Sequence, residues 1–194
     1  FAKTGGLADV AGALPKALAN LGHDLKVFMP KYHTVDEKKY KLSYMKSIGK
    51  MDVRTGGHDH HAYVYQGKLP DSNVDIYFID NPYFFHRNTF YTNDWDEDER
   101  YSFFSKAVIE TIQRLNWKPD IMHCNDWQTG LIPLMIREHY RWDSLFWETA
   151  NLFTIHNIGY QGVFGMEAGY RAELKEEHMA PNGAAELNGS INFM

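Results

Sequence analysis

Apolar positions along the chain follow two spacings, one typical of helices and one typical of buried strands. From residue 7 to residue 19, apolar side chains recur every three or four positions, which predicts an amphipathic helix that ends near Gly22. Pro15 lies within this pattern, where a proline either kinks a helix or begins its second half. The next segment, residues 25–30, is a short apolar run of the kind expected for a buried strand.

The same alternation of strand and helix returns twice further along the chain. Strands are expected over residues 74–80, 120–126 and 151–156, and helices over residues 99–115 and 130–140. Strands that alternate with helices indicate an α/β fold, in which a parallel sheet has helices on both faces. Residues 61–67 and their neighbours predict an antiparallel hairpin inserted at one edge, and residues 162–190 predict an irregular excursion with short helices. The sequence has no repeat or linker, so we expect a single domain.

Composition and charge narrow the classes of function. The 194 residues are enough for one domain with a sizeable core. The 20 Lys and Arg residues against 25 Asp and Glu residues give a net charge of -5, spread along the chain, so nucleic acid is not an expected partner. The single cysteine, Cys124, excludes an intrachain disulfide and favours a reducing compartment. No segment resembles a membrane helix or a signal peptide, so we expect no membrane partner and a cytoplasmic protein, or a plastid protein in a plant.

Polar residues gather at three junctions between the predicted elements. KTGGLAD, residues 3–9, precedes the first helix, whereas HCNDWQTG, residues 123–130, and HNIGYQG, residues 156–162, each follow a predicted strand. In a parallel α/β sheet, ligands bind beyond the carboxyl ends of the strands. We therefore expect these three segments to meet at one crevice.

The first junction has the composition of an anion site. Paired glycines, Gly5 and Gly6, allow a ligand to approach the backbone, and the start of the following helix favours negative charge. Lys3 adds a positive charge, so the segment suits a phosphate or diphosphate. The spacing matches neither of the common Gly-rich phosphate motifs, and a plain Gly-rich turn with a solvated Lys3 is an equal alternative.

The other two junctions have the composition of a sugar site. Asp126 can accept hydrogen bonds from hydroxyl groups, and Trp127 offers an apolar ring that can stack on a pyranose. The alternative is that Asp126 caps the next helix and Trp127 packs in the core. His156 and Asn157 follow an apolar strand, where they either bind a hydroxylated ligand or serve the structure.

Several clusters are expected to have no catalytic or metal role. His60 and His61 are adjacent and would point to opposite faces of a strand, so the HDHH segment is not expected to bind a metal. The acidic residues of 93–100 lack the glycine and closing glutamate of a calcium loop, which favours a solvated acidic loop. Cys124 lies in a predicted strand and is expected to be a buried thiol. The aromatic residues of 81–95 either pack under a loop or line a carbohydrate surface.

Three motifs in order resemble those of one enzyme family. FAKTGGLADVAGALPKALANLGHDLKVFMPKY resembles the start of bacterial glycogen synthases and plant starch synthases, and HCNDWQTGLIP and FTIHNIGYQGVF match the next two segments of that family. The resemblance extends to Phe164, and INFM at the end of the chain also fits. Three ordered motifs are a far more specific signal than one.

The resemblance implies a retaining glucosyltransferase of the two-domain GT-B architecture. Such enzymes transfer glucose from a nucleotide sugar, usually ADP-glucose, to the non-reducing end of an α-1,4-glucan. The resemblance implies that this chain, residues 1–194, is the Rossmann-like N-terminal half, without its first strand and without the C-terminal nucleotide-binding domain. Alone, it is then expected to be inactive and marginally stable. No cofactor or metal is implied.

The resemblance also implies roles for individual residues. The implied donor-binding residues are Lys3, Gly5 and Gly6, the implied catalytic residues are Asp126 and His156, and the implied acceptor-binding residues are Tyr91, Trp127 and Asn157. Asn125 and Gln128 stand where histidine is common in some relatives.

Two functions from other classes are weighed against this one. The first is a non-catalytic glucan-binding or regulatory module, whose binding would be indifferent to ADP-glucose. The second is a nicotinamide-dependent oxidoreductase, which is disfavoured because the first loop lacks the dinucleotide fingerprint and residues 25–30 end without an acidic residue for the ribose.

Overall fold

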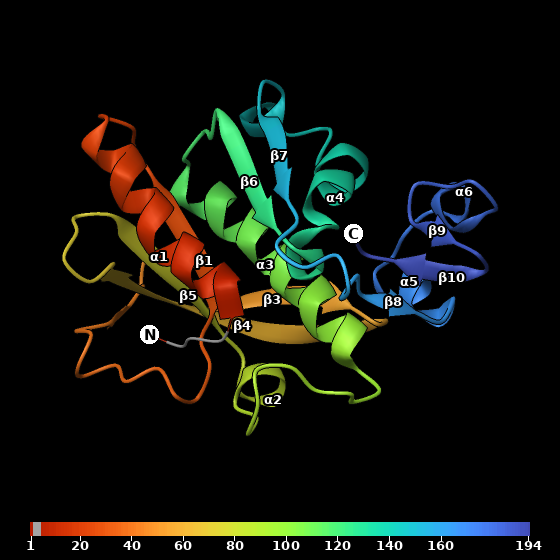
Figure 1. Ribbon diagram of the computed structural model, residues 1–194, viewed down its shortest axis with the longest axis horizontal. Helices are drawn as coiled ribbons and strands as arrows, with labels where there is room; N and C mark the ends of the chain where they lie inside the picture. Colours follow the sequence, from red (N-terminus) through yellow and green to blue (C-terminus); the bar gives the residue numbers. More distant parts are fainter. Residues whose placement is uncertain (2–4) are drawn as a thin grey trace. The chain divides into compact units, whose positions relative to one another are not determined.

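The computed structural model describes Phe1 and residues 5–194 of the chain. These residues divide into two compact units, which are described separately. Unit 1 comprises residues 1–52 and 61–92, and unit 2 comprises residues 53–60 and 93–194. Figure 1 shows the helices and strands in chain order. In the part of the chain that the structure describes, no helix combines the length and hydropathy needed to cross a bilayer.

Unit 1 begins with the predicted helix and the predicted strand. Helix α1 spans Gly5–Asn20 and includes Pro15 without a break in the helix. Its end is followed by Gly22, whose φ of 93° lies in the left-handed region that glycine adopts at least cost. Strand β1, Lys26–Pro30, pairs in parallel with β5, Asp75–Asp80. The predicted parallel α/β component is confirmed here.

An antiparallel hairpin extends this sheet, as the sequence predicts. Strands β2, β3 and β4 span Ser43–Tyr44, Met51–Thr55 and His58–Lys68. The strand order is β1-β5-β4-β2, and β3 pairs with β4. Residues 53–60, which end β3 and begin β4, belong to unit 2 and contain the turn at Gly56 and Gly57, whose φ values are both positive. Such a two-residue turn matches the twist of a hairpin. The sheet is therefore mixed, because β4 is antiparallel to β5.

The core of unit 1 lies on the parallel strands. One buried cluster there comprises Val35, Leu69, Val74, Ile76 and Phe78, against which residues of α1 and β1 also pack. Part of the aromatic segment that follows β5 packs inside the fold, and a carbohydrate surface in this segment stays a prediction. The segment forms a short helix α2, Pro82–Phe85, in which Phe84 and Phe85 are buried while Tyr83 is exposed.

Unit 2 contains a second parallel strand pair with helices from the adjoining sequence. Its main elements are α3, Glu97–Leu115; β6, Ile121–Asn125; η1, Trp127–Thr129; α4, Ile132–His139; η2, Ser144–Phe146; and β7, Ala150–Thr154. Strands β6 and β7 pair from Ile121 opposite Ala150 to Asn125 opposite Thr154. This register brings the ends of both strands to the same edge, where the polar junctions follow.

The last third of unit 2 has more regular structure than the sequence predicts. The expected short helices are α5, Glu167–Arg171, and α6, Glu176–Met179. Strands β8, Val163–Phe164, β9, Glu186–Leu187, and β10, Ser190–Asn192, add a small antiparallel sheet in the order β8-β10-β9. These elements gather at the blue end of the chain in Figure 1. The strands are too short for a periodic pattern to identify them.

The prediction of a solvated acidic loop is wrong. Asp96 is the N-cap of α3 and residues 97–99 form its first turn, and all four side chains are buried, with at most 6% exposed. Glu97 pairs with Arg100, Asp98 with Arg171 and Glu99 with His60, at 3.0, 2.7 and 3.0 Å. The first turn of a helix also favours negative charge. His60 is about 40 positions from Glu99 in the sequence, and Arg171 is 73 positions from Asp98. No local sequence pattern could therefore predict these two charge-assisted contacts.

Candidate functional site

The site in unit 2 is centred on Asp126, which follows the last residue of β6. Its backbone has φ 56° and ψ 176°, a combination that residues other than glycine rarely adopt and that costs about 1–3 kcal/mol. Its N–H donates to the carbonyl of Thr154 at 2.9 Å, which continues the β6–β7 ladder by one residue. Such backbone strain is found where a residue is held for function. Asp126 is 8% exposed.

The carboxylate of Asp126 binds the backbone of the segment that follows β7. Its Oδ1 accepts the N–H of His156 at 2.7 Å and the N–H of Asn157 at 3.4 Å. The side chain makes no capping hydrogen bond to η1. The capping alternative is therefore wrong, and the structure brings Asp126, His156 and Asn157 together as the sequence predicts.

Thr129 closes the turn that holds Asp126. Its Oγ1 accepts the N–H of Asn125 at 2.7 Å and lies 2.9 Å from the carbonyl oxygen of Asn125, to which the hydroxyl can donate. The backbone N–H of Thr129 also donates to the carbonyl of Asp126 at 3.1 Å. The sequence analysis missed this role, although a threonine three residues after an aspartate in a strand-to-helix turn is a recognisable signal.

Asn125 fixes the orientation of His156. Its Oδ1 lies 2.9 Å from Nε2 of His156, and its Nδ2 donates to the carbonyl of His123 at 3.4 Å. Because the amide oxygen can only accept, Nε2 of the half-buried imidazole is the donor of this hydrogen bond. Within the described part of the chain, Nδ1 and the carbonyl oxygen of His156 have no hydrogen-bond partner. Both are therefore free to meet a ligand.

A second histidine links β6 to β7 near the carboxyl ends of the two strands. His123 lies on β6, and its Nε2 is 2.8 Å from Oγ1 of Thr154 on β7. Burial of the ring, and to a lesser extent the nearby His156, lowers the pKa of His123. His123 therefore stays neutral in the folded protein under conditions that protonate an exposed histidine.

This lowered pKa predicts a pH-dependent loss of stability. As pH falls from 7, the unfolded chain takes up a proton at position 123 before the folded chain does, so the equilibrium moves toward unfolding. Above the ordinary histidine pKa of about 6.5 the effect vanishes. We expect His123→Gln to lose less stability than the unaltered protein between pH 7 and pH 5, measured by urea unfolding. Parallel stability curves for the two proteins would contradict this expectation.

Trp127 packs inside unit 2, as in the core alternative. It is 8% exposed, and its ring contacts those of Tyr101, Phe164 and Phe193 with centroids 5.0 to 6.4 Å apart. Gly162, with φ 65°, lies so close that a Cβ there would be 2.5 Å from the ring. Trp127 thus fixes the HNIGYQG segment against η1, and its contact with an acceptor stays a prediction.

Asn157 and Tyr160 lie on the exposed part of the same segment. Oδ1 of Asn157 accepts the N–H of Gly159 at 3.0 Å, which forms a local turn. Tyr160 is 72% exposed. These polar groups are accessible for hydrogen bonds to a hydroxylated ligand.

The remaining predicted site residues lie in unit 1. Lys3 is outside the described residues. Gly5, with φ 68°, and Gly6 begin α1, and no described heavy atom lies within 4 Å of a Cβ built on either. The positive φ favours glycine, and the open space leaves the backbone accessible. Tyr91 is 47% exposed. The phosphate-binding and acceptor-binding roles stay predictions.

The groups expected to be inert have ordinary structural surroundings. Cys124 is 2% exposed, and burial raises the pKa of its thiol to about 12, so it is no nucleophile at neutral pH. His60 lies 3.0 Å from Glu99, and His61 lies 2.7 Å from Asp52. The two histidines therefore face different carboxylates.

Comparison with known proteins places this geometry in a family. A model of the starch synthase catalytic domain matches residues 1–194. The chain belongs to this family. Its relatives include glycogen synthases from Desulforudis audaxviator, 42% identical over 206 residues, and Streptococcus agalactiae serotype III, 39% identical over 204 residues. Both alignments cover 100% of this chain but only 39% and 40% of the relatives, so the chain spans about two fifths of their length.

A solved structure of the starch synthase family has the same fold. The catalytic domain of starch synthase IV from Arabidopsis thaliana, a structure bound to ADP and acarbose, matches with a TM-score of 0.86 and 27% identity. The match covers 99% of this chain and 39% of that one. The family resemblance and the α/β fold predicted from the sequence are both confirmed.

Proposed function

We propose that the protein containing this chain transfers glucose from ADP-glucose to the non-reducing end of an α-1,4-glucan, with retention of configuration. The chain supplies the N-terminal, Rossmann-like half of a GT-B enzyme. The remaining half of the protein holds the nucleotide, and the chain alone is inactive. The reaction takes place in the cytoplasm and needs no cofactor beyond the donor.

One observation supports this proposal most directly. At the carboxyl ends of β6 and β7, Asp126 and His156 are held together by a hydrogen bond of 2.7 Å, with Nδ1 and the carbonyl of His156 unused by the described residues. Ligands of parallel α/β sheets bind at this edge. A fixed carboxylate beside fixed acceptors suits a sugar whose hydroxyl groups need hydrogen-bond partners.

The chemistry assigned to these residues is charge stabilisation and positioning. As the bond from the anomeric carbon to the diphosphate breaks, positive charge develops on the sugar, and the Asp126 carboxylate and the His156 carbonyl stabilise it. The leaving diphosphate takes the proton of the acceptor hydroxyl, so the acceptor attacks from the same face. Lys3 and the backbone N–H groups at Gly5 and Gly6 offset the charge of the diphosphate. Tyr91 and Asn157 orient the acceptor glucan.

The donor role of the first loop is tested by Lys3→Ala in the full-length protein. We expect the KM for ADP-glucose to rise by about tenfold or more, because a charge-assisted contact to the diphosphate is lost. Transfer of radiolabelled glucose to glycogen measures both kcat and KM. Lys16→Ala, at the other end of α1, is the matched control and is expected to leave both unchanged.

The same assay separates the proposal from the alternative. A folded, full-length protein that binds glycogen but incorporates no label from ADP-glucose would be a glucan-binding module. Label transferred from UDP-glucose in preference to ADP-glucose would keep the reaction class and correct the donor.

A further inference from the structure

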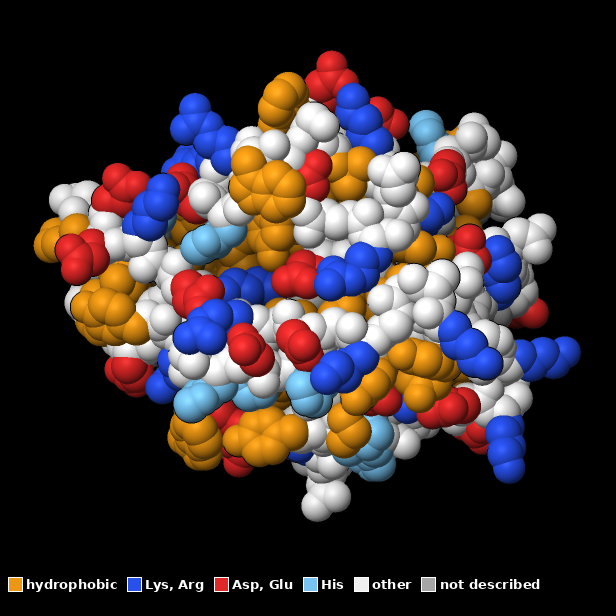
Figure 2. Space-filling view, turned by 180° about the vertical axis from the view of Figure 1, so that it is seen from behind, with side chains coloured by type: hydrophobic (Ala, Val, Ile, Leu, Met, Phe, Trp, Pro, Cys, Tyr) orange, Lys and Arg blue, Asp and Glu red, His pale blue; other side chains and the backbone are white. Residues whose placement is uncertain are grey.

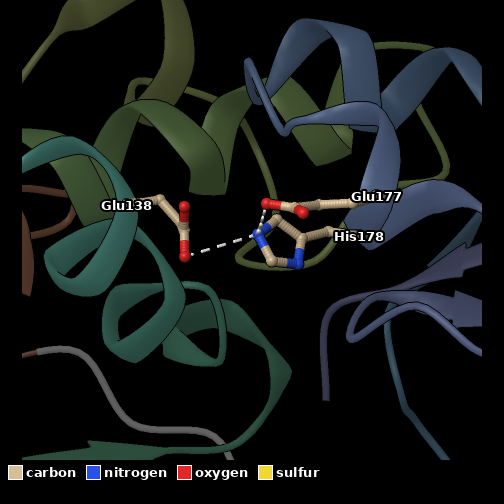
Figure 3. Close-up of side chains that lie close together, drawn as sticks. All are labelled: Glu138, Glu177 and His178. Carbon is tan, nitrogen blue, oxygen red and sulfur yellow. Dashed lines mark ion pairs between the residues drawn. The ribbon is translucent and has the colours of Figure 1, made fainter.

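Three side chains from α4 and α6 converge in unit 2. Glu138 belongs to α4, whereas Glu177 and His178 belong to α6, and the three side chains point toward one another in Figure 3. One ligand-type atom from each lies within 4.8 Å of those from the other two. The 39 positions between Glu138 and Glu177 explain why no sequence motif predicts this cluster.

The imidazole of His178 is buried without a hydrogen bond to its Nε2. The residue is 6% exposed, and Nε2 is one of the few buried polar atoms that has no hydrogen-bond partner in the described structure. The atom faces Oε1 of Glu138 at 3.5 Å and Oε1 of Glu177 at 3.7 Å. A buried polar atom without a hydrogen bond costs free energy, and a bound cation would supply the missing interaction.

The two distances are long for hydrogen bonds but suitable for ligands of one metal ion. In a tetrahedral zinc site with Zn–N and Zn–O distances near 2.0–2.1 Å, neighbouring ligand atoms are about 3.3–3.5 Å apart. The two separations from Nε2 are within a few tenths of an ångström of that value, and the carboxylate oxygens of Glu138 and Glu177 lie within 4.8 Å of each other. One imidazole and two carboxylates are also ligands that Zn²⁺ accepts, with water at the fourth position.

Two basic side chains also contact Glu138. Lys175 pairs with Oε2, and Arg137 donates to Oε1 at 3.1 Å. These contacts place two positive charges beside the Glu138 carboxylate, with which a bound cation would compete. Both side chains are more than half exposed and can move into solvent when a cation arrives.

We propose that Glu138, Glu177 and His178 form a Zn²⁺ site that fastens α6, and with it the excursion after β8, to α4. The site stabilises the fold and is independent of the proposed transferase reaction. Its occupation satisfies the buried Nε2 and links two elements that are distant in the sequence. Zinc binding should therefore raise the thermal stability of the protein.

The experiment is calorimetric titration of metal-free, full-length protein with Zn²⁺. We expect one ion per chain and a rise in melting temperature, and Co²⁺ in place of Zn²⁺ should give the visible absorption of a tetrahedral site. Glu177→Gln removes a ligand from an exposed position and should weaken binding by about tenfold or more without unfolding the protein. Glu176→Gln, the neighbouring exposed glutamate of the same helix, is the matched control and should bind as the unaltered protein does.

Lys175→Met gives a second test, which distinguishes a metal site at Glu138 from a simple ion pair between Lys175 and Glu138. Removing the competing ammonium group should tighten zinc binding about threefold, because the metal no longer displaces it. The proposal is overturned if zinc does not bind stoichiometrically, or if Glu177→Gln and Glu176→Gln bind it equally. Equal binding would assign the metal to other histidines among the ten in the chain.

Discussion

Asp126→Asn is expected to lower kcat for glucosyl transfer by about 10²–10³, or roughly 3–4 kcal/mol of transition-state stabilisation. Asparagine keeps an oxygen that can accept the N–H of His156, so the hydrogen bond of 2.7 Å can persist. The substitution removes the negative charge that faces the developing positive charge of the sugar. The loss should therefore appear in kcat more than in the KM for ADP-glucose.

The control for this prediction is Asp120→Asn, at the opposite end of the same strand. Asp120 is exposed, and its carbonyl accepts the N–H of Ala150. The chemical change is identical but is made far from the polar edge of the strand pair, so kcat should stay within about twofold. Measuring both variants with radiolabelled ADP-glucose, beside their circular dichroism spectra, separates loss of chemistry from loss of fold. A kcat for Asp126→Asn near that of the control would remove Asp126 from the catalytic machinery.

The sequence predicts the strands and the polar junctions because both leave local signals. The apolar run at residues 120–126 becomes β6, Ile121–Asn125, and the run at 151–156 becomes β7, Ala150–Thr154. Parallel pairing then brings Asp126 and His156 to one edge, as expected from the fold class. What the sequence does not predict is the conformation that holds them. The positive φ of Asp126 and the bond from Asn125 to His156 arise only when the two strands pair.

The acidic residues at the start of α3 show the limit of local patterns most clearly. A run of like charges usually forms a solvated face, and the sequence around Glu97 and Glu99 has that composition. The burial of these carboxylates depends on His60 in the hairpin and Arg171 in α5, which arrive only through the tertiary fold. The small sheet of β8, β9 and β10 escapes prediction for a related reason, since its strands gain stability from packing rather than from their own sequence.

Arg171→Met is expected to lower the free energy of unfolding by about 3–5 kcal/mol, because it leaves one charge of a buried pair without its partner. Asp98 is 1% exposed, and its Oδ2 lies 2.7 Å from Nε of Arg171. The first turn of α3 offsets part of the charge but cannot replace the guanidinium. As a control, Arg114→Met removes an exposed pair with Glu110 on the same helix and should cost at most about 0.5 kcal/mol.

Replacing the other partner, Asp98, should lower the free energy of unfolding by less. This difference distinguishes a charge left buried without a partner from the loss of a contact alone. In Asp98→Asn, Arg171 keeps partial exposure of 23% and the carboxylate of Glu167 at 4.0 Å, so about 1–2 kcal/mol is expected. The double variant should be no less stable than Arg171→Met, because removing the isolated carboxylate relieves the penalty. Urea unfolding of all four proteins at pH 7 measures these differences. Equal losses for the two single variants, with additive loss in the double variant, would show that the pair does not act as a buried ion pair.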